Sequence, residues 1–333
     1  MPRAAEGSPS RAGGEMSDKG PLTPPDIERW RRGDSGIEFV HRLSGPRPGP
    51  NALITALMHG NEACGAVALL RLLETPPALE CGSLTLAFAN VAAYARIDRR
   101  RPEEGRFVDE DMNRLWTRER LEGQAKSVEL ARARLLRPFA DAADYLLDLH
   151  SMMEGRIPLA LAGTARKGMR LARRVGFPAT VVADPGHAGG VRLRDYDGFG
   201  EEAGEKAALL VECGQHFARE SAEVALEAAL RFLAAIGMLA PEELALRLGK
   251  RPLPPQRFIE VTHVVTIATD AFAFVVPCDS LRPIAKAGTL IARDGEREVV
   301  TPYDECVPIM PARALKRGLT AVRLGRIVRP RAG

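Results

Sequence analysis

The sequence predicts an α/β fold with a largely parallel sheet, followed by a small all-β region. Up to about residue 250, apolar runs bounded by turn residues alternate with segments of helical periodicity. Beyond the proline-rich stretch at 251–255, short β-rich runs are separated by Gly, Asp and Pro. We therefore expect a disordered tail at 1–22, a larger α/β domain at 23–250 and a small β domain at 251–333.

The α/β region opens with a strand, a tight turn and a helix. Residues 52–58 form a continuous apolar run, which is typical of a strand buried on both faces. Apolar residues then recur at helical spacing over 66–73, before Pro76 and Pro77 end the pattern. The other expected strands are 37–41, 84–89, 143–149, 157–161, 180–182 and 207–211, and the other expected helices are 127–140, 167–175 and 222–236. In the C-terminal region the expected strands are 258–269, 272–277, 289–292 and 299–300.

Composition and charge exclude several classes of function. The chain has 333 residues with 47 Lys and Arg against 43 Asp and Glu, and acidic residues interrupt its basic runs, so nucleic acid is not an expected partner. No uninterrupted apolar run reaches the ~18 residues of a membrane span. Five widely spaced cysteines without a C-x-x-C pair indicate neither a disulfide framework nor a thiolate metal site. Together with the lack of an apolar signal segment in the tail, this predicts a cytoplasmic protein, and homo-oligomerisation stays open.

The strongest local signal is the H-G-N-E motif at 59–62, which lies at the expected strand-to-helix turn. An imidazole and a carboxylate three residues apart share one face where a helix has begun, so His59 and Glu62 can both reach one ion. A catalytic zinc site needs three N or O ligands and an open position for water. His150 is the best-placed third ligand, because it directly follows the apolar run at 143–149.

The surroundings of these three residues offer further polar groups. Asp148 and Ser151 flank His150 and could orient its ring. His187 and His216 lie in expected loops that could line the same cleft, although loop histidines are ordinarily solvated. His41 and His263 lie within strand-like runs and are interpreted as structural.

An arginine-rich segment separates the first and third expected ligands. Residues 96–114 carry six arginines interleaved with acidic residues and end in D-M-N-R at 111–114. A planar guanidinium beside an amide is a usual means of holding a carboxylate through two hydrogen bonds. We therefore interpret this segment as an anion pocket.

Four motifs in order resemble the succinylglutamate desuccinylase/aspartoacylase family, a branch of the zinc carboxypeptidase-like fold. They are H-G-N-E at 59–62, R-(x)6-N-R at 106–114, D-x-H-S at 148–151 and E-C-G at 212–214. The resemblance spans about residues 35–240, and the C-terminal region looks like the appended barrel-like module of the family. It implies a three-layer α/β/α domain with a mixed, largely parallel sheet.

The resemblance also implies catalytic roles for matching residues. His59, Glu62 and His150 match the ligands of one zinc ion per chain. Arg106 matches the arginine that polarises the scissile carbonyl and stabilises its oxyanion. Glu212 matches the glutamate that acts as general base and then as general acid.

Substrate binding is implied for a second group of residues. Asn113 and Arg114 match the pair that binds the substrate carboxylate, with Asp111 in support. A further substrate-contacting arginine of the family corresponds to Arg192 or Arg194, and the spacing does not decide between them; Arg194 is taken as the candidate.

The sequence therefore predicts a zinc-dependent hydrolase that acts on a linear amide and removes an acyl group from a small, anionic N-acylated amino acid. Aspartate-type, succinyl-type and acetyl substrates all stay open. Tyr303 either reaches the site from the β region or is an ordinary turn tyrosine.

One alternative function is that of a zinc carboxypeptidase that acts on peptides. Another is a non-catalytic sensor of zinc or carboxylate, against which the presence of Glu212 weighs. A docking role for the β region also stays open.

Overall fold

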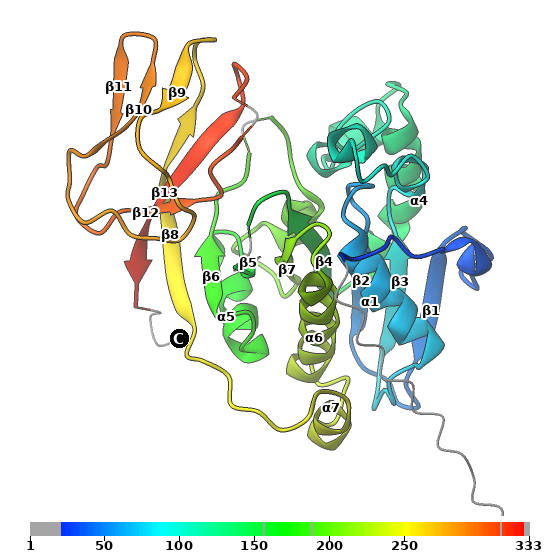
Figure 1. Ribbon diagram of the computed structural model, residues 1–333. Helices are drawn as coiled ribbons and strands as arrows, with labels where there is room; N and C mark the ends of the chain where they lie inside the picture. The colour runs from blue at the N-terminus through cyan, green and yellow to red at the C-terminus, as the bar shows by residue number, and fades with distance from the viewer. Residues whose placement is uncertain (1–20, 156, 188, 314, 330–333) are drawn as a thin grey trace, which may run out of the picture.

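One ten-stranded mixed sheet runs through the computed structural model, which describes residues 21–155, 157–187, 189–313 and 315–329. The spatial order of the strands is β1-β3-β2-β4-β7-β5-β6-β8-β13-β12 (Figure 1). These strands are β1 Val40–Ser44, β2 Asn51–Ala56, β3 Ser83–Phe88, β4 Tyr145–Met152, β5 Leu159–Leu161, β6 Thr180–Ala183, β7 Ala207–Gln215, β8 Arg257–Thr266, β12 Val307–Ile309 and β13 Thr320–Val328. The predicted tail at 1–22 lies outside the described residues except for its last two.

Helices cover both faces of the sheet, which confirms the predicted α/β class. They are α1 Ala63–Glu74, α2 Val91–Tyr94, α3 Arg118–Glu122, α4 Val128–Ala142, α5 Arg166–Val175, α6 Arg219–Ala235 and α7 Pro241–Leu248. Successive strand residues point to opposite faces, so Ile54 and Leu147 share a core with α1, α5 and α6, whereas Leu53 and Leu146 share one with α4. None of the helices in the described ranges is long and apolar enough to cross a membrane.

Three neighbouring strands create the edge on which the candidate residues lie. Strand β2 pairs in parallel with β3 and β4, and β4 pairs in parallel with β7. Strand β1 runs antiparallel to β3, and β5 runs antiparallel to β7 but parallel to β6. The ladder pairs His150 of β4 with Glu212 of β7. The predicted strands at 143–149 and 207–211 ended before these two residues. In the structure both strands continue past them, because the two ends pair with each other.

The C-terminal region is joined to the main sheet. Strand β8 pairs in parallel with β6 and antiparallel with β13, and β13 pairs with β12. A separate three-stranded antiparallel sheet contains β9 Phe272–Phe274, β10 Leu290–Asp294 and β11 Arg297–Val300. The predicted domain boundary at residue 250 thus lies just before β8, a strand that continues the sheet of the α/β region. The division of the chain into two domains stays a prediction.

The sequence patterns did not predict helix α7 or strands β12 and β13 of the main sheet. Helix α7 has only eight residues, and its apolar side is limited to the partly buried Leu244 and Leu248, so its periodicity is too short to mark it. Strand β13 contains two arginines and a glycine, which obscure its alternation.

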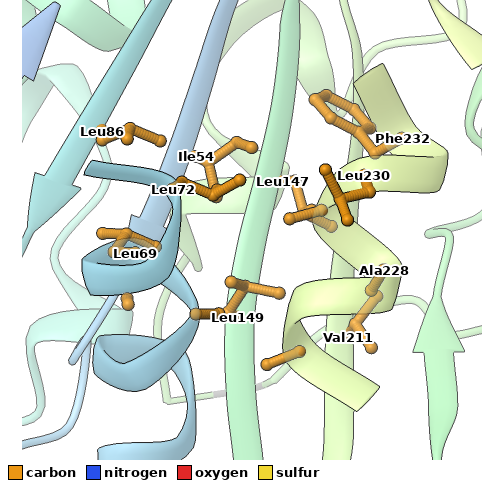
Figure 2. Close-up of a cluster of buried hydrophobic side chains, with 14 of the residues drawn as sticks. Ile54, Leu69, Leu72, Leu86, Leu147, Leu149, Val211, Ala228, Leu230 and Phe232 are labelled. Atoms are coloured by element: carbon orange, nitrogen blue, oxygen red, sulfur yellow. The ribbon is translucent and has the colours of Figure 1, made fainter. Parts of the chain in front are cut away.

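We predict that Leu147→Ala lowers the free energy of unfolding by about 2–5 kcal/mol, because it leaves a cavity in the centre of the core. Leu147 is 1% exposed, and Figure 2 shows it between Ile54 and Leu72 on one side and Leu230 on the other. The measurement is urea unfolding followed by circular dichroism. Leu246→Ala is the control, since Leu246 is 81% exposed, and it should change stability by no more than about 0.5 kcal/mol. Equal effects of the two substitutions would contradict the prediction.

Candidate metal centre and surrounding site

The H-G-N-E motif occupies the turn between β2 and α1. Glu62 is the residue immediately before the first turn of α1, and the amide of Glu62 donates to the carbonyl of His59. A Cβ atom at Gly60 would lie 2.3 Å from the carbonyl carbon of Ala93 and 2.5 Å from the carbonyl oxygen of Gly105, so no side chain fits there. The Gly60 amide also donates to the carbonyl of Arg106, which fixes the arginine-rich segment against the turn.

His59, Glu62 and His150 form a buried cluster whose ligand atoms all lie within 4.8 Å of one another. Glu62 is central and 2% exposed. Its Oε1 lies 2.8 Å from His59 Nδ1, and its Oε2 lies 2.9 Å from His150 Nδ1. Two imidazole nitrogens therefore converge on one carboxylate, which is a donor set that can hold a metal ion.

The far side of each imidazole contacts a second carboxylate. His59 Nε2 lies 3.0 Å from Asp111 Oδ1, and His150 Nε2 lies 2.7 Å from Asp148 Oδ2. Asp148 also accepts a hydrogen bond of 2.6 Å from Thr55 Oγ1. Such partners fix the orientation of a ligating imidazole and raise its basicity.

Opposed effects act on the pKa of Glu62. Burial alone would raise it, but His150 and His59 outweigh burial and hold the pKa of Glu62 well below its usual range. Glu62 is therefore a carboxylate in the folded chain, which is the form that binds a cation.

Glu212 lies across the β4–β7 ladder from His150 and is also buried. Burial, reinforced by the charge of Glu62, raises the pKa of Glu212 to about 8. Its Oε2 has no hydrogen-bond partner among the residues that the structure describes. A buried oxygen without a partner is uncommon in proteins, and this one is available to take up a proton.

Arg106 is brought into contact with the cluster. Its Nη2 donates to Asp111 Oδ2 at 3.1 Å and lies 2.9 Å from His59 Nε2. Burial would lower its pKa, but Asp111 and Glu62 outweigh burial and raise it. The guanidinium is therefore a permanent positive charge beside the His59–Glu62–His150 cluster.

Asn113 and Arg114 follow Asp111 in a short 3-10 helix, Met112–Arg114. Asn113 is buried, with Nδ2 3.4 Å from His150 Nε2 and Oδ1 accepting from the Leu193 amide at 2.9 Å. Arg114 Nη1 donates to the Asn113 carbonyl, while its Nη2 lies 3.7 Å from Asp111 Oδ2. Asn113 is thus held on two sides, whereas Arg114 Nη2 is only weakly paired.

The structure does not bring Arg194 to the His59–Glu62–His150 cluster. Its guanidinium is buried and donates to the carbonyls of Ala162 and Ala208 and to Asp195, so it faces the sheet interior. Arg192 instead pairs with Asp184 at 2.6 Å. Burial lowers the pKa of Arg114, and the charge of Arg192 is one of those that lower it further. Of the two arginines that the spacing left open, Arg192 is the one near Arg114.

His216 differs from the solvated loop histidine that the sequence indicated. It is buried, and its Nδ1 lies 2.8 Å from Ser151 Oγ. Burial lowers the pKa of His216 to about 4, so the ring is neutral near pH 7. His187 contacts Arg323, and Tyr303 contacts Thr262 and Arg326.

Sequence reasoning missed Glu129, which holds the loop that carries Arg106 and Asp111. Glu129 lies in the first turn of α4 and is fully buried. Its carboxylate accepts from the amides of Val108, Asp109 and Glu110 at 2.6, 3.0 and 3.3 Å, and from Asn90 Nδ2 at 3.1 Å. An acidic residue in a first turn is ordinarily explained by the helix dipole, so the local pattern does not reveal this role.

A model of the succinylglutamate desuccinylase/aspartoacylase catalytic domain matches residues 48–237. The chain belongs to the succinylglutamate desuccinylase/aspartoacylase family. The matched range includes the His59–Glu62–His150 cluster, Arg106 and Glu212. Membership in this desuccinylase/aspartoacylase family supports a deacylase hydrolase activity. No curated protein sequence matches the chain significantly.

Several solved structures share the fold of this chain. A succinylglutamate desuccinylase from Vibrio cholerae is 18% identical, with a TM-score of 0.65, over 87% of this chain and 86% of that chain. A succinylglutamate desuccinylase/aspartoacylase from Rhodobacter sphaeroides is 16% identical, with a TM-score of 0.63, over 90% of this chain and 93% of that chain. The product-bound ectoine utilization protein EutE (DoeB) from Ruegeria pomeroyi is 19% identical, with a TM-score of 0.61, over 87% of this chain and 89% of that chain.

We predict that Glu129→Gln lowers the free energy of unfolding by about 1–3 kcal/mol, because each carboxylate oxygen accepts two hydrogen bonds and the new NH₂ group must face donors. Urea unfolding measures the loss. Glu119→Gln on the neighbouring helix α3 is the control, since Glu119 is exposed. A Glu129→Gln chain as stable as this control would show that the carboxylate does not hold the loop.

Proposed function

We propose that this chain is a zinc-dependent amidohydrolase that removes an acyl group from a small, anionic N-acylated amino acid. One observation carries the proposal: Glu212 lies directly across the β4–β7 ladder from His150, a member of the buried His59–Glu62–His150 cluster. A candidate base is thus positioned beside a candidate metal site. Family membership supports the deacylase class, whereas the ion, the residue roles and the substrate are proposed.

The donor set supports zinc as the ion. Two imidazoles and one carboxylate, each buried, are a ligand combination of catalytic zinc sites. Asp111 and Asp148 occupy the Nε2 side of the two rings, so both Nδ1 atoms are available to the ion. A zinc ion held by His59, Glu62 and His150 would lower the pKa of a water molecule toward ~7 and draw charge from the carbonyl oxygen of the substrate.

Glu212 is proposed to move the proton. It takes a proton from the attacking water as the water oxygen bonds to the acyl carbon, and it gives that proton to the amine nitrogen as the C–N bond breaks. A group that must accept and then donate works best with a pKa near the operating pH. The burial that raises the pKa of Glu212 to about 8 supports this role.

Arg106 and Arg114 are proposed to bind the charges of the substrate, and Asn113 is proposed to position the groups around them. Arg106, beside His59, donates a hydrogen bond to the carbonyl oxygen of the substrate, which becomes negative during the attack. Such a contact often lowers the activation free energy by a few kcal/mol. Arg114 binds the substrate carboxylate through its weakly paired Nη2. Asn113, whose amide already contacts His150 and Leu193, holds the two sides of the site together.

The compartment is proposed from the cysteines. All five are free thiols, and three of them are buried. Free thiols of this kind are usual in the reducing cytoplasm. We therefore propose a cytoplasmic enzyme.

We predict that the purified chain binds about one zinc ion, because the described residues contain one buried cluster of three possible ligands. His150→Ala should retain far less zinc after dialysis, as determined by elemental analysis. His263→Ala is the matched control, since His263 is exposed and lies far along the chain in β8. Full zinc content in the His150→Ala chain, or loss in the control, would argue against this ligand set.

We predict that the zinc-loaded chain hydrolyses members of a panel of N-acetyl, N-succinyl and N-acyl-aspartate compounds, and that Glu212→Gln lowers kcat by about 10²–10⁴-fold. Glutamine cannot accept a proton, yet its shape and the fold are preserved. Product release, measured by chromatography, separates deacylation from truncation of control peptides. Glu223→Gln, an exposed ion-pair residue of α6, is the control and should leave kcat unchanged. Undiminished turnover by a folded Glu212→Gln chain would overturn the mechanism.

A further inference from the structure

An open groove of about 650 Å³ lies where helix α6 begins. Three stretches of the chain form it: the residues before η1, the arginine-rich segment and the turn between β7 and α6. The lining residues are Pro24, Ile97, Asp98, Arg99, Arg100 and Phe217. Sites for small molecules usually have volumes of about 300–1,000 Å³, so the groove is large enough for a ring. None of the four family motifs includes these residues.

Hydrogen bonds of the chain itself hold the walls of the groove. The Leu22 amide donates to the Phe217 carbonyl at 2.7 Å. The Phe217 amide donates to Gln215 Oε1 at 2.9 Å. Tyr94 Oη donates to the Pro25 carbonyl at 2.6 Å. The three stretches are therefore fixed against one another.

One wall of the groove leads to the His59–Glu62–His150 cluster through His216. The rings of Phe217 and His216 are neighbours, with centroids 6.2 Å apart. His216 is buried, and its Nδ1 lies 2.8 Å from Ser151 Oγ. The Ser151 amide donates to Glu62 Oε2 at 3.3 Å. Phe217, His216 and Ser151 thus connect the groove with the central carboxylate of the cluster.

A second wall leads to Arg106. Gly105 packs against Ile97, since a Cβ atom at Gly105 would lie 3.3 Å from the Ile97 Cα atom. The next residue, Arg106, contacts His59 with its Nη2. Burial, together with the charge of Arg106, lowers the pKa of His216, so these two side chains are near each other. Both walls therefore lead to the same cluster.

The groove and Arg114 lie on different sides of His150. Asn113, which precedes Arg114, contacts the Nε2 atom of His150 at 3.4 Å. Glu62, which the groove reaches through Ser151, contacts the Nδ1 atom at 2.9 Å. Because Arg114 is proposed to bind the carboxylate of the amino-acid part of the substrate, the acyl part extends toward the groove.

The main surfaces of the groove are planar. The Arg99 guanidinium lies over the Phe217 ring, 5.6 Å from its centroid. Pro24 and Ile97 add apolar area. An aromatic ring gains from contact with another ring and with a guanidinium in addition to the burial of its area. A saturated ring of similar size gains only the burial.

The acidic residue Asp98 is compensated within its own loop. Its Oδ1 accepts from the Arg100 amide at 2.8 Å, and its Oδ2 lies 3.5 Å from Arg101 Nε. Asp98 therefore does not favour a cation in the groove, and an uncharged ring fits the lining.

We propose that this groove binds the acyl group of the substrate and that it selects an aromatic acyl group. The identity of the ligand as a substrate rests on the proposed function. Phe217 and Arg99 are then specificity-determining residues, which contact the ring and not the reacting atoms. The groove extends the range of acyl groups beyond acetyl and succinyl.

The test compares matched acyl groups on aspartate, glutamate and alanine: benzoyl with cyclohexanecarbonyl, phenylacetyl with cyclohexylacetyl, and 3-phenylpropionyl with 3-cyclohexylpropionyl. We expect at least one aromatic compound to have a kcat/KM about tenfold or more above that of its saturated partner, since ring and guanidinium contacts together contribute on that scale. Phe217→Leu keeps apolar volume but removes the ring, so it should abolish most of this preference. Phe274→Leu is the matched control, because Phe274 lies in β9 of the separate sheet, and it should keep the preference.

A second measurement does not depend on turnover. Isothermal titration of the zinc-loaded chain compares benzoate with cyclohexanecarboxylate, phenylacetate with cyclohexylacetate, and 3-phenylpropionate with 3-cyclohexylpropionate. At least one aromatic acid should bind more tightly than its saturated partner, and Phe217→Leu should remove the difference.

Other results would overturn the proposal. These are a wild-type chain without an aromatic preference, a Phe217→Leu chain that keeps it, or a Phe217→Leu chain in which both members of a pair weaken by the same factor, as expected of a purely structural role. If Phe217→Leu does not fold, Arg99→Gln decides by the same ratio, since Arg99 is exposed and covers the ring.

Failure of the groove and failure of the proposed function are distinguishable. A chain that hydrolyses no N-acyl amino acid, but prefers aromatic acids and loses this preference in Phe217→Leu, keeps the groove and loses the enzyme. A chain that hydrolyses N-acetyl amino acids without any aromatic preference keeps the enzyme and loses the groove.

Discussion

The parallel pairing of β2, β4 and β7 is the constraint on which the site depends. Parallel strands end at one edge of the sheet, so His59 after β2, His150 in β4 and Glu212 in β7 meet although they are far apart in sequence. The helical layers hold the register of these strands through a continuous core. A register shift of one residue in β4 would turn His150 and Asp148 to the other face, and the buried Glu62 would lose one of its two imidazole partners.

Carboxylates organise the site at each level. Glu62 joins the two imidazoles, Asp111 and Asp148 support their far sides, and Glu129 holds the loop that carries Arg106. Each is compensated by hydrogen bonds or by positive charge, as buried carboxylates must be. Glu212 is the exception, because one of its oxygens has no partner among the described residues. That difference distinguishes a group that can exchange a proton from groups that fix geometry.

The part of the site that the sequence could predict is the part encoded locally. The H-G-N-E turn and the D-x-H-S segment each follow an apolar run, so period and turn residues alone place them at strand ends. Arg192 and Arg194 show the limit: they are two residues apart beside a 3-10 helix, yet one pairs with Asp184 and the other enters the sheet interior. Glu129 and Arg323 act on segments that only tertiary packing brings near. The pairing of β8 with β6 also has no local signature.

The pairing of β8 with β6 means that the C-terminal region protects a sheet edge that would otherwise be exposed. All four residues of β6, Thr180–Ala183, are buried, and β8 satisfies their outward backbone groups. A chain ending near residue 250 would present β6 as a flat, apolar edge strand, which is a template for pairing between molecules. Insolubility of such a fragment would then reflect an unprotected edge rather than a faulty core, and the C-terminal strands would be needed for solubility independently of any role in the site.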